Sequence, residues 1–183
     1  MTSSPTVPPV GSSLAPRDSA STGGVGGFVL KASVAGAALA VPAAWVWASV
    51  ADPPRAVLTA RGVSFGESQL NQQSEITLWF LVVGLAFGTA AGLVTGLLGR
   101  RRGLDTVAAV AALCLVGAAL TAFLGISVFG PDAEADLARS TVGESVTSDL
   151  RVDSLLAYLG WPIGGLAGLC VAIYTWPVTP NDA

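Results

Sequence analysis

Residues 84–96, GLAFGTAAGLVTG, place a glycine at every fourth position of an apolar run: Gly84, Gly88, Gly92 and Gly96. A glycine costs about 1 kcal/mol relative to alanine inside a helix in water. On an ideal α-helix a four-residue step drifts by only about 40°, so these glycines share one face. Between membrane helices, small residues allow two backbones to approach and gain van der Waals contact. The segment therefore predicts a membrane-spanning helix with a close-packed face, the pattern called a glycine zipper.

The composition of the whole chain also favours a membrane protein. Of its 183 residues, 52% are hydrophobic and 11% are charged, whereas soluble domains carry roughly 25% charged residues. Histidine, the commonest general base and metal ligand, is absent from the sequence. We expect no catalytic residue, no metal site, no cofactor and no nucleic-acid partner. Lys31 is the only lysine beside eight arginines, and alanine, glycine and valine abound. That bias is typical of a GC-rich genome and suggests an actinobacterial source.

Four apolar runs, at about 28–50, 76–98, 106–129 and 154–177, are each long enough to cross a hydrocarbon core about 30 Å thick as a helix. Residues 1–25 are rich in Ser, Thr, Pro and Gly and predict a disordered cytoplasmic tail. The predicted fold is an all-α integral membrane protein, a four-helix bundle within residues 26–178. Its aromatic residues fall mostly near run ends, as interfacial anchors do. They are Trp45, Trp47, Trp79, Tyr158, Trp161 and Trp176.

The loop 99–105 contains three adjacent arginines, Arg100, Arg101 and Arg102. Basic residues in short loops mark the cytoplasmic side of a membrane protein. The loops 51–75 and 130–153 are net acidic, which favours the opposite side. We therefore predict a multi-pass protein of the cell (inner) membrane with both termini in the cytoplasm. An alternative is that Ser49-Val50-Ala51 ends a cleaved signal peptide, which mass spectrometry of the mature N-terminus would distinguish.

The two extracytoplasmic loops predict some structure of their own. Residues 56–59 and 63–65 flank Ala60-Arg61-Gly62, which reads as a small β-hairpin. A lone hairpin is marginal in water, so we expect it to rest on the membrane surface or on the other loop. Residues 67–75 predict a polar helical lead-in to the second span. Residues 133–150 predict irregular or short helical structure. Both loops contain Gly-Glu-Ser, at 66–68 and 143–145. Either the two halves of the chain arose by duplication, or the match is a coincidence.

The first and last spans repeat the small-residue pattern. On the last span, Gly160, Gly164 and Gly168 share an arc with Ala167 and Ala172. The first span does the same with a series made mostly of alanine: Ala32, Gly36, Ala40, Ala44 and Ala48. Cys114 and Cys170 lie in apolar runs, where we expect small buried hydrophobic side chains rather than a disulfide.

Two prolines interrupt these spans, Pro42 in the first and Pro162 in the last. Each lacks an N–H, and each leaves the carbonyl four residues earlier unpaired. We expect kinks at a similar depth, either tolerated as such or opening an outward-facing crevice between the two helices. The spans hold no acidic residue and only Lys31 as a basic one. Because intramembrane ionisable residues mark ion and proton pathways, this argues against ion-coupled transport.

Several patches together resemble a family of small actinobacterial four-span membrane proteins classed as a domain of unknown function. They are residues 54–59 (PRAVLT), Glu67 to Trp79, the arginine loop 99–103 and Gly160-Trp161-Pro162. The resemblance covers about residues 50–177. It implies a four-helix membrane protein and supplies no activity and no functional residues.

The sequence favours a non-enzymatic scaffold or accessory subunit that packs through small-residue helix faces, either on itself as a homo-oligomer or on a larger membrane complex. The alternative is an oligomeric passive channel or small-solute pore. A third hypothesis is an envelope enzyme that uses the carboxylates of the acidic loops.

Overall fold

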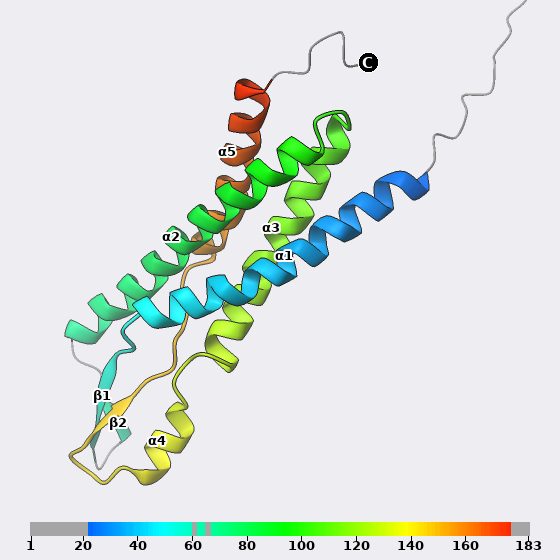
Figure 1. The fold of residues 1–183 in the computed structure, drawn as a ribbon. Coiled ribbons are helices and arrows are strands. Elements are labelled where there is room, and N and C mark those ends of the chain that lie inside the picture. The colour runs from blue at the N-terminus through cyan, green and yellow to red at the C-terminus, as the bar shows by residue number, and fades with distance from the viewer. Residues whose placement is uncertain (1–21, 60–61, 65–66, 177–183) are drawn as a thin grey trace, which may run out of the picture.

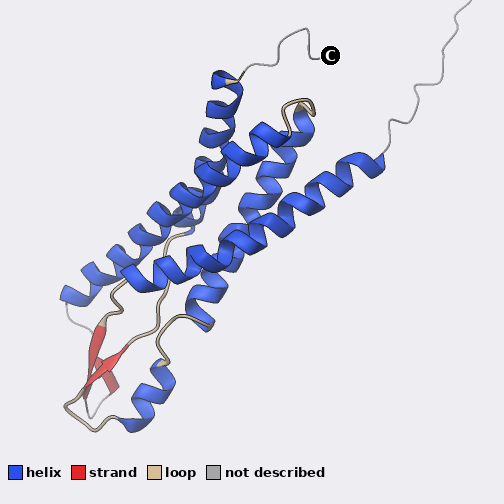
Figure 2. Cartoon of the chain, in the orientation of Figure 1, coloured by secondary structure: helices blue, strands red, loops and turns tan. Residues whose placement is uncertain are grey.

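The computed structural model describes residues 22–59, 62–64 and 67–176, and Figures 1 and 2 show their arrangement. The elements in chain order are α1 (Thr22–Val50), β1 (Arg55–Thr59), β2 (Gly62–Ser64), α2 (Glu67–Leu98), α3 (Leu104–Ser127), α4 (Ala133–Arg139), β3 (Ser145–Thr147), the 3₁₀ helix η1 (Leu155–Leu159) and α5 (Gly160–Thr175). Four long helices form a bundle, and the strands and α4 lie together at one end of it (Figure 2). We call this the sheet end.

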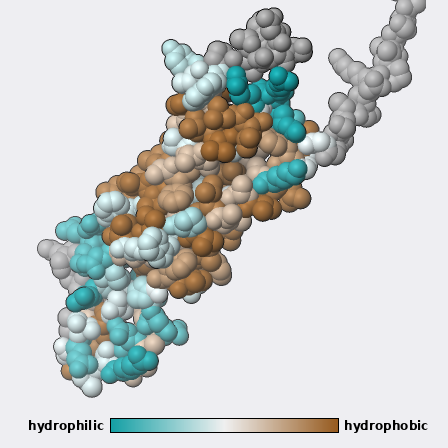
Figure 3. Space-filling view, viewed as in Figure 1, coloured by the Kyte–Doolittle hydropathy of each residue, from teal (hydrophilic) through white to brown (hydrophobic). Residues whose placement is uncertain are grey.

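The opposite end of the bundle holds the α2–α3 connection with its arginines, and we call it the arginine end. The start of α1 and the end of α5 lie on this side as well (Figure 1). Four helical segments have the length and apolar character to cross a membrane. They are Gly24–Val50, Asn71–Leu98, Leu104–Ser127 and Leu155–Thr175. Figure 3 shows a hydrophobic band between hydrophilic residues at the two ends. The chain is therefore a multi-pass membrane protein.

Two of the long helices begin before their apolar runs. α1 begins at Thr22, so residues 22–25 of the predicted tail are helical; the rest of that tail lies outside the described residues. α2 begins at Glu67, so the predicted polar helical lead-in of residues 67–75 is confirmed, and it continues without a break into the apolar run. Adding turns to a helix that already exists is far easier than starting one, which explains why polar or glycine-rich flanks join the spans.

The four long helices associate as two pairs, α1 with α3 and α2 with α5. The pairs join through contacts of α3 with α5 and of α2 with both α1 and α3. α1 is the least covered of the four: 17% of its most apolar window is buried, compared with 39–44% in the others. One side of α1 therefore lies open along most of its length.

Two tryptophans that the sequence suggested as interfacial anchors are instead fully buried, and each links the two pairs. Trp47 of α1 covers Gly125 of α3, and its Nε1 donates a hydrogen bond to the carbonyl oxygen of Ile76 in α2 at 3.1 Å. Trp161 of α5 lies against Gly117 of α3 and Gly84 of α2. Glycines on the facing helices leave room for both rings, which is why these two indoles do not project to the membrane interface.

The predicted hairpin is present as β1 and β2, with Val57 opposite Ser64 and Leu58 opposite Val63. A third strand from the second acidic loop, β3, pairs antiparallel with the other edge of β1, so the order is β2-β1-β3. Of the two supports expected for the hairpin, the structure shows the other loop. The short helix expected there is α4, whereas β3 was not predicted. Residues 60–61 of the hairpin turn lie outside the described residues.

The described residues of the two Gly-Glu-Ser tripeptides lie in different elements. Glu67 and Ser68 start α2, whereas Gly143 sits in a turn with φ +104° and Ser145 starts β3. The two Glu-Ser pairs are therefore not structurally equivalent.

Candidate functional site

The glycines singled out from the sequence lie in one interface, between α2 and α5, which we call the glycine seam. Its members are Gly84, Gly88, Gly92 and Gly96 of α2 and Gly160, Gly164, Gly165 and Gly168 of α5. A Cβ built on Gly160 would lie 2.6 Å from the carbonyl oxygen of Leu81. Those built on Gly88 and Gly92 would overlap the carbonyl oxygens of Trp161 and Gly165. At most seam positions main chain thus meets main chain, which only glycine allows, whereas Gly84 and Gly96 lie closest to side chains of α5.

The seam is intramolecular, so the glycine faces of α2 and α5 are used within the chain. Two positions differ from the sequence prediction. Gly165, which was not predicted, faces Gly88 and Gly92 of α2 and Cys114 of α3. Ala167, which was predicted to share the arc, is exposed. The adjacent glycines Gly164 and Gly165 were the sequence signal for this contact, because together they make the small-residue face of α5 wide enough to pack on both α2 and α3.

The small-residue series on α1 faces α3. Ala32, Gly36, Ala40 and Ala44 are buried, and a Cβ on Gly36 would lie 2.5 Å from the carbonyl oxygen of Leu113. Ala48 is partly buried. The opposite side of α1 is exposed and carries both small and large side chains. It includes Gly27, Lys31, Val34, Ala35, Ala38, Val41, Pro42, Trp45 and Ser49.

The prolines lie in different surroundings. α1 continues through Pro42 as one helix, and Pro42 is on its exposed side. Pro162 lies in the first turn of α5, just after the change from 3₁₀ to α-helix at Gly160. Pro162 is the third residue of α5 and the eighth of the helical segment Leu155–Thr175, which matches the depth expected from the sequence. α1 and α5 belong to different pairs and do not pack directly on each other along their lengths, so the two prolines do not face a shared α1–α5 interface.

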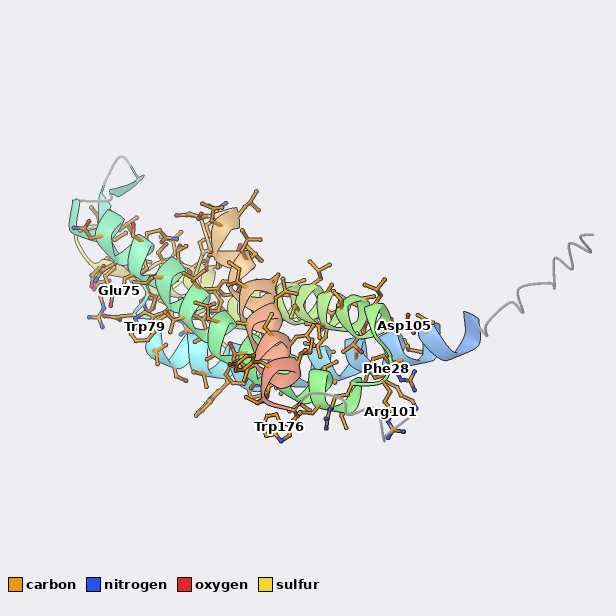
Figure 4. The ribbon with its side chains drawn as sticks, turned by 90° about the horizontal axis from the view of Figure 1, so that it is seen from above. Phe28, Glu75, Trp79, Arg101, Asp105 and Trp176 are labelled. Atoms are coloured by element: carbon orange, nitrogen blue, oxygen red, sulfur yellow. The ribbon has the colours of Figure 1, made fainter. Side chains whose placement is uncertain are left out.

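The arginine loop is anchored to α1 rather than standing free. The Arg102 guanidinium lies 4.5 Å from the centre of the Phe28 ring, and its Nη1 donates to the carbonyl oxygen of Gly24 at 3.4 Å. The Thr106 hydroxyl donates to the carbonyl oxygen of Gly99 at 2.6 Å, which closes the loop on its other side. Figure 4 shows Phe28, Arg101 and Asp105 together at this end. Arg100, Arg101 and Arg102 are all exposed.

At the sheet end, a carboxylate joins α4 to the sheet. Asp136 Oδ2 accepts a hydrogen bond from the backbone N–H of Thr147 at 3.1 Å. This bond from Thr147 is the main reason that the pKa of Asp136 is lowered, and the nearby Arg139 charge adds to it. A pocket of about 290 Å³ lies between α4 and the sheet, lined by residues such as Ala56, Leu137 and Val146.

The described residues contain no group of three or more His, Cys, Asp or Glu side chains arranged to hold a metal ion. Both cysteines are free: Cys114 is buried as expected, but Cys170 is exposed on α5. Two buried polar atoms have no hydrogen-bond partner in the described part of the chain, Thr121 Oγ1 and Trp161 Nε1.

No family model matches this chain, and no curated protein or solved structure matches it either.

Proposed function

We propose that the chain is a non-enzymatic scaffold or accessory subunit of a multi-pass membrane assembly, and that it docks to its partner through the exposed side of α1. The observation that carries this proposal is the unequal covering of the spans. α1 buries 17% of its most apolar window, less than half the share buried in any other span. Small residues on a membrane helix favour association with a second helix, and Ala35 and Ala38 lie on the exposed side.

The glycine seam is not the docking face in this proposal. Its glycines are covered by α5 or α2, so a partner helix could reach them only by displacing part of the bundle. This revises the sequence-based idea that these glycines hold a partner. The small three-stranded sheet stands at the end opposite the α2–α3 connection (Figure 1), where it offers a second, polar surface to a partner.

The proposal includes an orientation and a family. The three adjacent arginines, Arg100, Arg101 and Arg102, lie at one end and the net-acidic loops lie at the other, which supports the arginine end and both termini on the cytoplasmic side of the cell membrane. The likeness to small actinobacterial four-span proteins of unknown function is part of the same proposal. A cysteine substituted for Arg101 or for Val142 tests the orientation by labelling with an impermeant maleimide in intact cells. Only the Val142→Cys variant should be labelled.

The experiment that tests the scaffold function is co-purification from native membranes with a matched pair of variants. Ala38→Leu adds bulk to the exposed side of α1, and Ala167→Leu adds the same bulk to the exposed side of α5. We expect Ala38→Leu to lose the partner and Ala167→Leu to keep it, with both bundles folded. Equal retention by the two variants, or solute flux through liposomes that hold the purified protein, would contradict the proposal.

A further inference from the structure

A groove at the sheet end lies between the start of the α2 span and the segment that leads into α5. The part nearer the sheet, about 380 Å³, is lined by Gln73, Ser74, Thr77, Asp153 and Ser154. The part nearer the middle of the bundle, about 260 Å³, shares three of these residues and adds Leu78, Leu81, Leu156 and Ala157. Because the two parts share Ser74, Thr77 and Ser154, they form one continuous groove. We call it the sheet-end groove.

The groove changes from polar to apolar along its length, and the change falls at the membrane boundary. The apolar spans that border it begin at Asn71 and Leu155. Gln73 and Asp153 therefore lie near the headgroup level, and Leu78 and Leu81 lie one to two turns deeper along α2. The groove is open sideways, since Leu78 is 55% and Leu156 is 72% exposed. What lies sideways of a membrane-spanning helix at this depth is lipid, so the geometry selects a lipid as the occupant.

The polar part of the groove offers hydrogen-bond acceptors and a negative charge. Asp153 is exposed and contributes the charged group of that lining. Ser154 Oγ accepts from the N–H of Leu156 and caps η1. Thr77 donates its hydroxyl hydrogen to the carbonyl oxygen of Gln73, which leaves its oxygen as an acceptor. An ammonium group has three donors and no acceptor, so it complements this set.

The walls of the groove are held in place by a contact between its two sides. Gln73 Nε2 donates to the carbonyl oxygen of Arg151 at 2.9 Å, which fixes the chain before η1 against α2. Glu75 and Trp79 lie along the other side of α2, away from η1 (Figure 4). Asp153 thus lines the groove, and the acid Glu75 of α2 lies away from it.

We propose that the sheet-end groove binds one membrane phospholipid with a primary-ammonium headgroup. The ammonium lies beside the Asp153 carboxylate, and one acyl chain lies along Leu78, Leu81 and Leu156. This site is separate from the α1 face on which the scaffold function depends.

The test is native mass spectrometry of the full-length protein released from nanodiscs that contain equal amounts of phosphatidylethanolamine and phosphatidylcholine with identical acyl chains. We expect one lipid to be retained, with roughly a twofold to fivefold preference for the ethanolamine lipid, within the range for an exposed ion pair. Asp153→Asn should abolish the preference and Asp153→Glu should keep it. Asp149→Asn, an exposed acid beside the other pocket, is the matched control and should behave as the wild type.

Three results would overturn the proposal. They are equal retention of the two lipids by the wild type, an unchanged preference in Asp153→Asn, and a second copy of the chain cross-linked at Leu156 in place of lipid. Protection of Cys114 from thiol reagents confirms in each case that the variant bundle is folded.

Discussion

The Trp47 indole Nε1 donates a hydrogen bond to the carbonyl oxygen of Ile76 at 3.1 Å, and this bond ties α1 to α2 across the two helix pairs. The same ring stands edge-on to Phe80, with ring centres 5.0 Å apart and planes at 73°. Trp47→Phe removes the N–H and part of the ring that covers Gly125. Interhelical hydrogen bonds in membranes contribute about 0.6–1.7 kcal/mol, and the unfilled space adds to that loss.

We therefore expect Trp47→Phe to lower the free energy of unfolding by about 1–3 kcal/mol in a detergent titration. Trp45→Phe is the matched control, because Trp45 lies two residues away and is 59% exposed. An equal loss of stability in the two variants would contradict the assignment of Trp47 to the core.

Gly92→Ala tests the glycine seam. An added Cβ at this position would overlap the carbonyl group of Gly165, and backbone cannot move aside as a flexible side chain can. We expect a loss of about 1–3 kcal/mol, as for other overpacked cores. Gly26→Ala adds the same methyl group where nothing lies within 4 Å, so its thermal unfolding in detergent should match or slightly exceed that of the wild type. Two equally destabilised variants would mean that the seam is not closely packed.

Asp136 makes the attachment of α4 to the sheet dependent on pH. The hydrogen bond from Thr147 lowers the pKa of Asp136, so folding favours the ionised form. The stabilising contribution is present above the carboxyl's ordinary pKa and is lost as the pH falls through the lowered value. We expect hydrogen exchange at the Thr147 amide to accelerate at acidic pH, after correction for intrinsic rates.

Asp136→Asn should remove that pH dependence, and Glu134→Gln, on the same short helix, should retain it. If the corrected exchange rate at Thr147 changes with pH in Asp136→Asn as in the wild type, another group controls the contact.

The two free cysteines should differ in reactivity with a thiol reagent in detergent micelles. Cys170 is exposed on α5, whereas Cys114 is buried against Gly165. We expect N-cyclohexylmaleimide to label the Cys114→Ala variant within minutes, and to label the Cys170→Ala variant only after denaturation. Rapid labelling of Cys114 in the folded protein would contradict the packing of α3 on α5.

The spans and the hairpin were predictable because their signals are local. A run of more than twenty apolar residues has few alternatives to a transmembrane helix, and Gly62 between two β-prone segments is a short-range turn signal. The sharing of one face by Gly84, Gly88 and Gly92 follows from helix geometry alone. Helix geometry does not determine what covers that face, because the choice between α5 and another protein depends on tertiary packing.

The misassigned tryptophans show the same limit. Trp47 and Trp161 lie near run ends like true interfacial anchors, and only the facing glycines distinguish them. Gly117, Thr121 and Gly125 repeat at four-residue intervals on α3, but nothing in the sequence pairs these glycines with an indole. β3 was missed for a related reason. Three residues, Ser145–Thr147, carry too little alternation to predict a strand, and β1 supplies the missing information.

The pairing of β3 with β1 has a consequence for the order of biogenesis. Arg55 and Thr147, which stand opposite each other in the sheet, are separated in the chain by α2 and α3. The β1–β2 hairpin is made early, but its second edge stays open until two more spans have been inserted and the next loop has emerged. An open strand edge invites pairing with other chains. The sheet can therefore be completed only after the third span has crossed the bilayer. A chain stalled before that point would expose an unpaired strand edge that can pair with other chains.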